Sequence, residues 1–247
     1  MKDINFLNVK ISPYFLFKTL AIIKNAIEKK LIITQTSINV AKVVSAQKDL
    51  QLRNSINQSD IVNIDGYGVY FVLRLIGYKK IERIAGIDLF EKLLEISNDN
   101  RYSIYFLGGT DEIINNTVMK VKKNYPNIKI SGHHHGYIWQ NEREIVDTIK
   151  ICKPNILFIG ISSPLKENFI NQWKDYIGAN LYMGVGGSFE VFVGKIERAP
   201  LFIQKIGFEW LYRVVQEPRR LSKRYFITNT LYVFYLIKYF IKSKFKF

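Results

Sequence analysis

The sequence predicts an α/β fold built of βαβ units around a parallel sheet, followed by a helical C-terminal segment. Short apolar segments rich in Ile, Leu, Tyr and Phe alternate with helix-length amphipathic segments over the first 190 or so residues. Strand signals then stop. With 247 residues, 48% of them hydrophobic, the chain can bury the core of one large domain or of one domain with an appendage.

Each predicted strand is four to six residues long, and most end at Gly or at a polar turn. The strands lie at 31–34, 61–64, 103–108, 128–131, 156–160 and 181–185. Helix-length amphipathic segments lie between them, at 38–56, 87–97, 111–125 and 141–151. Strands separated in this way by helices indicate a parallel sheet.

The C-terminal segment differs from the rest in composition, so we expect a boundary between 190 and 200, with units at 1–195 and 196–247. Helices broken near Pro218 are predicted, and from Lys195 onward 7 Lys and 5 Arg stand against 3 Glu, a net charge of +9 within the overall +15. Such a charge attracts nucleic acid, an anionic membrane surface or a diphosphate substrate, although a solvated lysine-rich face is the simpler explanation.

The apolar run at 225–241 is interrupted by polar residues and is too short to span a bilayer. The N-terminus lacks the cleavage pattern of a signal peptide. A single cysteine, Cys152, excludes an internal disulfide and favours a reducing cytoplasmic compartment.

Asp65, in the stretch NIDGYGVYFVLRLIG (63–77), follows a predicted strand directly and precedes a helix-like segment. Spacing alone favours an N-cap of that helix. The carboxyl ends of parallel strands also face the ligand crevice, where a carboxylate can serve as a general base.

Two glycine-rich loops are candidates for contact with a ligand. Gly108 and Gly109 follow a strand and precede a helix, which is typical of a phosphate-binding loop but equally of a tight turn. Gly186 and Gly187 belong to GVGGSFEVFVG (184–194), whose four glycines indicate backbone lying against a ligand, or else a flexible loop.

The remaining polar motifs have competing explanations. Ser162 and Ser163 could cap a helix beginning at Pro164, or could meet a substrate together with Lys166. Adjacent side chains on a strand point to opposite faces, so the histidines of GHHHGYIW (132–139) do not predict a metal site, and we expect no metal.

Several collinear stretches resemble the WecG/TagA/CpsF family of glycosyltransferases (family 26). They cover roughly residues 30–225 and read TSIN, NIDGYGVYFVLRLIG, ERIAGIDLFEKLL, YFLGG, GHHHGYI, PNILFIGISSPLKENFI, MGVGGSFEVFVGKIERAP and GFEWLYRVVQEPRRLSKRY.

The resemblance implies a Rossmann-like, mainly parallel sheet with helices on both faces, and a C-terminal helical appendage that reaches the membrane and closes the active site. It implies inverting, metal-independent transfer of a sugar from a UDP-sugar to a polyprenyl-diphosphate-linked saccharide, at the cytoplasmic face of the bacterial plasma membrane. A homo-oligomer is compatible with it. The alternative is a non-enzymatic phosphate-binding protein that uses its basic tail on a membrane or on nucleic acid; the tail carries no nucleic-acid-binding motif, so we expect no nucleic-acid partner.

By the same resemblance, Asp65 is the expected catalytic base and Arg83 lies near the donor. Residues of the TSIN stretch and of the loop at 184–190 are expected to line the nucleotide-sugar pocket, while cations of the appendage hold diphosphate. The residues so implicated are Ser37, Asn39, Glu190, Arg213, Arg220, Lys223 and Arg224.

The chain departs from the family pattern at SSPLKE, where Lys166 replaces a glutamine, and at Glu190, where Asp is more usual. The first departure leaves the donor sugar open and allows an acidic or differently substituted one. Residues 225–247 are expected to form an amphipathic helix on the anionic leaflet, or a helix packed on a neighbouring subunit.

Overall fold

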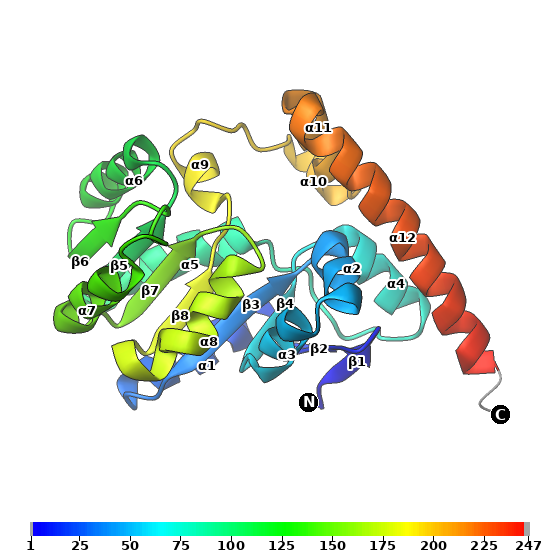
Figure 1. Cartoon of the computed structure of the whole chain (residues 1–247), viewed down its shortest axis with the longest axis horizontal. Helices are drawn as coiled ribbons and strands as arrows, with labels where there is room; N and C mark the ends of the chain where they lie inside the picture. Colours follow the sequence, from blue (N-terminus) through cyan, green and yellow to red (C-terminus); the bar gives the residue numbers. More distant parts are fainter. Residues whose placement is uncertain (1, 245–247) are drawn as a thin grey trace.

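The structure is a computed structural model that describes residues 2–244, except for the side chains of Arg220 and of residues 242–244. A central sheet is covered by helices on both faces, and a long C-terminal helix runs along one end of the molecule (Figure 1). This arrangement confirms the predicted α/β fold with its mainly parallel sheet.

The central sheet has six strands, all parallel, in the order β4-β3-β8-β7-β5-β6. These strands are β3 (Ile33–Ile38), β4 (Ile61–Ile64), β5 (Ser103–Gly108), β6 (Lys129–His134), β7 (Ile156–Gly160) and β8 (Leu181–Gly184). Every strand predicted from the sequence is present. Those at 61–64, 103–108 and 156–160 have the predicted bounds.

Strand side chains alternate between two apolar layers, as the pleat requires. Ile104 and Phe106 of β5 pack with one set of helices, and Tyr105 and Leu107 with another. The first set is α1 (Leu16–Glu28), α5 (Gly86–Asn100), α6 (Asp111–Asn124) and α9 (Ser188–Phe192). The opposite face carries α2 (Val40–Lys48), α3 (Leu50–Gln58), α7 (Glu142–Cys152) and α8 (Leu165–Ile177).

The single helix expected over 38–56 is two helices, α2 and α3. They meet at Asp49, which has extended backbone angles and whose side chain accepts a hydrogen bond from Leu52 N at 2.9 Å. An N-cap carboxylate in the middle of the segment starts a new helix. Neither α1 nor an N-terminal hairpin was predicted from the sequence. The hairpin consists of β1 (Ile4–Phe6) and β2 (Val9–Ile11), which have only three residues each.

Three helices form the C-terminal segment: α10 (Leu201–Lys205), α11 (Glu209–Gln216) and α12 (Pro218–Lys244). Pro218 opens α12, which confirms the predicted break and fits a residue that lacks a backbone N–H. Within the described residues, no helix is both long and apolar enough to cross a membrane.

The helix α12 packs on α2 and contributes to the core beside the N-terminal hairpin. Tyr232 is only 6% exposed and donates a hydrogen bond to the carbonyl oxygen of Gly68 at 3.2 Å. The ring of Tyr239 meets that of Phe6 edge-on, with centroids 5.7 Å apart. One face of α12 is therefore packed into the core that the preceding residues form.

We expect Tyr232→Ala to lower the free energy of unfolding by about 3–5 kcal/mol, because it empties a buried aromatic site and removes a hydrogen bond. Urea denaturation measures the change. Phe226→Ala is the matched control, since Phe226 lies on the same helix but is 76% exposed, and it should change stability by less than about 0.5 kcal/mol. Equal effects of the two substitutions would contradict the docking of α12.

Candidate active site at the carboxyl edge of the sheet

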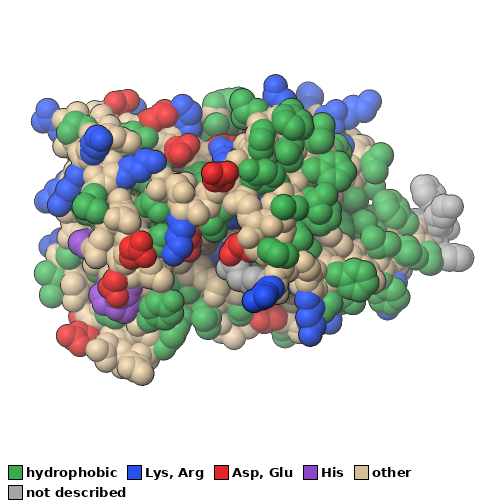
Figure 2. Space-filling model, turned by 90° about the horizontal axis from the view of Figure 1, so that it is seen from above, with side chains coloured by type: hydrophobic (Ala, Val, Ile, Leu, Met, Phe, Trp, Pro, Cys, Tyr) green, Lys and Arg blue, Asp and Glu red, His purple; other side chains and the backbone are tan. Residues whose placement is uncertain are grey.

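The carboxyl ends of β4, β3 and β8 lie side by side because the three strands are neighbours and parallel. Asp65 follows β4, Ser37 is near the end of β3, and the glycine-rich loop 184–187 follows β8. Seen from this side, acidic and basic side chains surround a hollow near the middle of the molecule (Figure 2). The edge is thus the place where charged groups from distant parts of the chain can meet.

Asp65 is held at this edge through both its backbone and its side chain. Its backbone N–H donates to Ile38 O of β3 at 2.9 Å, and its Oδ1 accepts a hydrogen bond from Gly86 N, at the start of α5, at 3.3 Å. The N-cap of α4 (Tyr67–Leu75) is Gly66, with no side-chain cap bond. The expectation that Asp65 caps the following helix is therefore wrong: its carboxylate is turned toward α5.

Burial raises the pKa of Asp65, and the positive charges of Arg83, Arg213 and Lys42, with the Gly86 N–H, partly oppose this rise. A partly buried carboxylate with a raised pKa is a stronger proton acceptor than an ordinary surface aspartate. The surrounding cations at the same time favour its charged form. This combination suits a general base.

Arg83 lies directly beside Asp65. Its Nη1 donates to the backbone oxygen of Asp65 at 3.2 Å, and its guanidinium lies 4.4 Å from the ring centroid of Tyr67. A bridge between Ile64 and Arg83 fixes the backbone of this segment against the end of β4. Arg83 and Asp65 are therefore neighbours at the carboxyl edge of the sheet.

The appendage reaches this cluster through α11. Glu209, its first residue, forms ion pairs with Arg83 at 3.5 Å and with Arg198 at 3.8 Å, and Arg198 also pairs with Asp88. These pairs link α11 to the segment after β4 and to α5. They bring the basic C-terminal segment to the edge of the sheet that carries Asp65.

Arg213, one turn further along α11, lies over the glycine-rich loop. A methyl group placed on Gly187 would lie 3.6 Å from Arg213 Nη2 and 3.6 Å from Glu190 Oε2. Glu190 Oε2 is buried and has no hydrogen-bond partner among the described residues. An arginine and an unpaired acceptor therefore flank the loop, and Gly186 there has a φ of 53°, a conformation that favours glycine.

A buried ion cluster lies between α2 and α8. Lys42 Nζ is 2.8 Å from Glu167 Oε1, and Lys166 Nζ is 3.8 Å from the same oxygen, with all three residues less than 10% exposed. Burial alone would raise the pKa of Glu167, but the two lysines bring it down to about 2. Burial and the charge of Lys42 lower the pKa of Lys166 to about 8, against the opposing effect of Glu167 and Asp65.

Ser37 and Asn39 lie at the end of β3, but both already have local partners. Ser37 Oγ accepts a hydrogen bond from Gln35 Nε2 at 3.0 Å, and Asn39 caps α2 by accepting from Lys42 N at 3.0 Å. The Asn39 cap holds the first turn of α2, and with it Lys42, at the site. Ser163 is exposed in the loop before α8; the N-cap of that helix is Pro164, without a side-chain cap bond, so capping by Ser162 or Ser163 is not observed.

Gly108 and Gly109 lie on the same edge at the end of β5. Four strand spacings separate β4 from β5, about 19 Å in all. Gly108 has a φ of 138°, and a methyl group there would lie 2.5 Å from the backbone of Gly160. Gly108 allows close packing of β5 on β7, and Gly109 lies against the side chain of Ile113 of α6. Both glycines lie outside the Asp65 cluster.

Among the described side chains at the start of α12, those of Lys223 and Arg224 do not join the cluster around Asp65. Lys223 and Arg224 are exposed, and neither forms an ion pair within the described part of the chain; Arg224 lies 5.3 Å from the ring of Tyr225. Arg220 belongs to α12, but its side chain lies outside the described residues.

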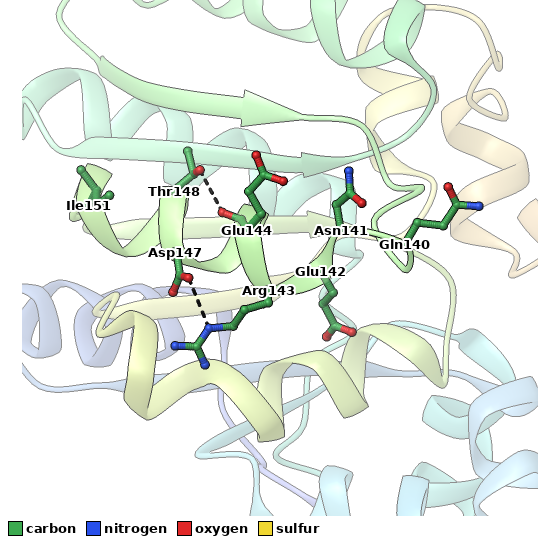
Figure 3. Close-up of a pocket in the computed structure, with 8 residues that line it drawn as sticks. All are labelled: Gln140, Asn141, Glu142, Arg143, Glu144, Asp147, Thr148 and Ile151. Atoms are coloured by element: carbon green, nitrogen blue, oxygen red, sulfur yellow. Dashed lines mark hydrogen bonds and ion pairs between the residues drawn. The ribbon is translucent and has the colours of Figure 1, made fainter.

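The histidine stretch lies at the other end of the sheet, on β6 and the loop that follows it. His133 Nε2 is 3.0 Å from Asn115 Oδ1, while His134 Nδ1 is 2.9 Å from the backbone oxygen of His135. Among the described residues, no group of three or more His, Cys, Asp or Glu side chains is placed to hold a metal. A nearby surface depression follows the outer face of α7, where Arg143 pairs with Asp147 (Figure 3).

Sequence reasoning missed Lys42 and Glu209. Lys42 lies in the first turn of a helix, where the macrodipole disfavours a cation, and this was its only local sign. Glu209 is one of three glutamates in a strongly basic segment. Their partners, Glu167 and Arg83, are more than a hundred residues away along the chain.

We expect Glu167→Gln to lower the free energy of unfolding by about 3–5 kcal/mol, because it leaves two buried ammonium groups without their carboxylate. Urea denaturation at pH 7 measures this, with the exposed Glu144→Gln as control. The folded-state pKa of Glu167, about 2, is below its ordinary 4.5, so its stabilisation is present above pH 4.5 and is lost as the pH falls toward 2. The variant should lack this acid-dependent component; a change below 0.5 kcal/mol would contradict the cluster.

The family model for the glycosyl transferase WecG/TagA/CpsF family matches residues 4–246. Three similar proteins each bear the name N-acetylglucosaminyldiphosphoundecaprenol N-acetyl-beta-D-mannosaminyltransferase. The one from Bacillus spizizenii is 35% identical over 67% of this chain and 64% of its own length. Those from Bacillus subtilis and Staphylococcus aureus are 32% and 34% identical, over 80% and 68% of this chain and 77% and 66% of their own lengths. The chain belongs to the WecG/TagA/CpsF family of glycosyl transferases.

Proposed function

We propose that this protein transfers a sugar from a UDP-sugar to a polyprenyl-diphosphate-linked saccharide during synthesis of a cell-surface polysaccharide. The observation that carries the proposal is the position of Asp65. Its carboxylate has a raised pKa and lies at the ligand edge of the sheet, surrounded by Arg83, Arg213 and Lys42. The cations of such a site can bind an anionic donor, and the carboxylate of Asp65 can accept a proton.

In the proposed reaction Asp65 accepts the proton of the acceptor hydroxyl. The oxygen attacks the anomeric carbon of the donor from the face opposite UDP, so a new C–O bond forms as the bond to the diphosphate oxygen breaks. The bonding electrons leave with UDP, and the configuration at the anomeric carbon is inverted. General base catalysis of this type contributes about 10²–10⁴-fold to rate.

Cationic side chains of the chain itself are proposed to neutralise the departing diphosphate, without a metal ion. Arg213 lies over Gly187, and Arg83 lies beside Asp65. A fixed positive charge in a partly dehydrated site stabilises developing negative charge without further reorganisation. The unpaired Glu190 Oε2 is available to accept a hydrogen bond from a donor hydroxyl.

The names of the relatives support an acceptor of one class. They describe transfer of N-acetylmannosamine to N-acetylglucosaminyldiphosphoundecaprenol. A diphosphate-linked acceptor fits the cationic edge of the sheet and the basic appendage. We therefore propose a lipid-linked N-acetylglucosamine acceptor. The identity of the transferred sugar depends on the side chains around Lys166.

A lipid-linked acceptor requires contact with a membrane, which we place at the cytoplasmic face. Hydrophobic side chains gather over the part of the molecule where the C-terminal helices lie (Figure 2). Phe202 of α10 is 66% exposed and Phe226 of α12 is 76% exposed. The outer faces of these helices combine apolar and basic side chains, as interfacial helices do.

We expect Asp65→Asn to lower turnover by about 10²–10⁴-fold while leaving donor affinity within a few-fold, because the amide cannot accept the proton. Transfer to a polyprenyl-diphosphate N-acetylglucosamine acceptor, measured in the presence of a chelator, is the assay. Since burial raises the pKa of Asp65, the acidic limb of the wild-type profile should lie above the usual pH range of a carboxylate. Near-normal turnover in a folded variant would refute the mechanism and favour a binding protein without catalysis.

We expect Phe202→Asp with Phe226→Asp to reduce sedimentation with vesicles containing phosphatidylglycerol by tenfold or more, because two exposed apolar contacts become negative charges. Truncation of α12 would be a poor test, since Tyr232 belongs to the core. The control is Ile151→Asp, at a 79% exposed position on α7. Undiminished sedimentation of the double variant would exclude this surface as the membrane contact.

A further inference from the structure

The ion cluster between α2 and α8 contains two ammonium groups and one carboxylate. Lys42 is the closer partner of Glu167, at 2.8 Å, and it completes a one-to-one ion pair. Lys166 shares the same oxygen from 3.8 Å and is 8% exposed. The single carboxylate of Glu167 can balance only one of the two ammonium charges. One buried positive charge is left without a counter-charge in the cluster, which is unfavourable.

The surplus charge faces the active site. The stem of Lys166 lies against the backbone of Gly184, where a methyl group would come within 2.7 Å of Lys166 Cε. Its ammonium lies 3.7 Å from the position of a methyl group on Gly186, at the carboxyl end of β8. The next carboxylate to act on it is Asp65, the proposed base. Lys166 therefore lies against the loop that follows β8 and within electrostatic reach of Asp65.

We propose that the ammonium of Lys166 is a binding subsite for an oxyanion of the donor substrate, either a carboxylate on the transferred sugar or the nucleotide diphosphate. This inference rests on the proposed function and adds a specificity-determining residue to it. The bound oxyanion supplies the counter-charge that the cluster lacks, so binding of the donor also neutralises the surplus positive charge.

A purely structural role explains the cluster less well. Glu167 already has a close partner in Lys42, and a methionine could fill the space of the Lys166 stem without adding charge. The lowered pKa of Lys166, about 8, agrees with an ammonium whose charge the cluster compensates incompletely. We expect such a residue to lower the stability of the folded protein while it favours ligand binding.

The test uses Lys166→Met in the full chain, with Lys123→Met, an exposed position on α6, as a control that removes the same charge. Isothermal titration calorimetry compares three probes: UDP, a neutral UDP-N-acetylhexosamine and the corresponding UDP-N-acetylhexosaminuronate. Because a hydrogen bond to a charged group is lost, we expect the affinity for the recognised oxyanion to fall by about tenfold to a hundredfold. Thermal unfolding should show an unchanged or higher Tm for Lys166→Met.

The pattern of loss identifies the oxyanion. Equal weakening of all three probes assigns Lys166 to the diphosphate, whereas selective weakening of the uronate assigns it to a sugar carboxylate. Unchanged affinities in a folded Lys166→Met variant, or failure of the wild-type chain to bind any probe, would overturn the proposal. Binding is measured without turnover, so failure of Asp65 as the base would leave this result standing.

Discussion

Burial of both faces of the six-stranded parallel sheet is the constraint on which the rest of the structure depends. Helices cover both faces of the sheet, and the strands β5, β7 and β8 accordingly consist largely of apolar residues. Charged side chains that come from several strands can then gather only where the strands end. Because all six strands are parallel, the ends of β4, β3 and β8 place Asp65, Ser37 and the glycine-rich loop on one edge.

Charge on this edge is arranged by contacts between segments that are distant in sequence. Glu209 of α11 meets Arg83, and Glu167 of α8 meets Lys42 of α2. In each case an acidic residue holds a cation near Asp65. The basic C-terminal segment therefore has two faces with different roles: Tyr232 packs into the core, whereas the apolar and basic outer face stays exposed.

Much of the fold could be predicted because period and composition are local properties. The strands at 103–108 and 156–160 consist mainly of apolar residues that end in glycine, and they appear in the structure with the predicted bounds. Local capping chemistry was harder to predict. Asp49 divides a helix that looked continuous, and Asp65 bonds to Gly86 although its position before α4 suggested a cap. An aspartate has several backbone N–H groups within reach, and the choice among them depends on the neighbouring segments.

The sequence by itself determined the alternation of strands and helices, the break at Pro218 and the position of Asp65 at the end of a strand. These follow from hydrophobic periodicity, from the missing N–H of proline and from strand direction, all of which are local. Only the tertiary structure decided which cations surround Asp65, and that α12 is half core and half surface. Ion pairs such as Lys42–Glu167 form between residues far apart in the chain, so their partners are selected by packing of helices on the sheet.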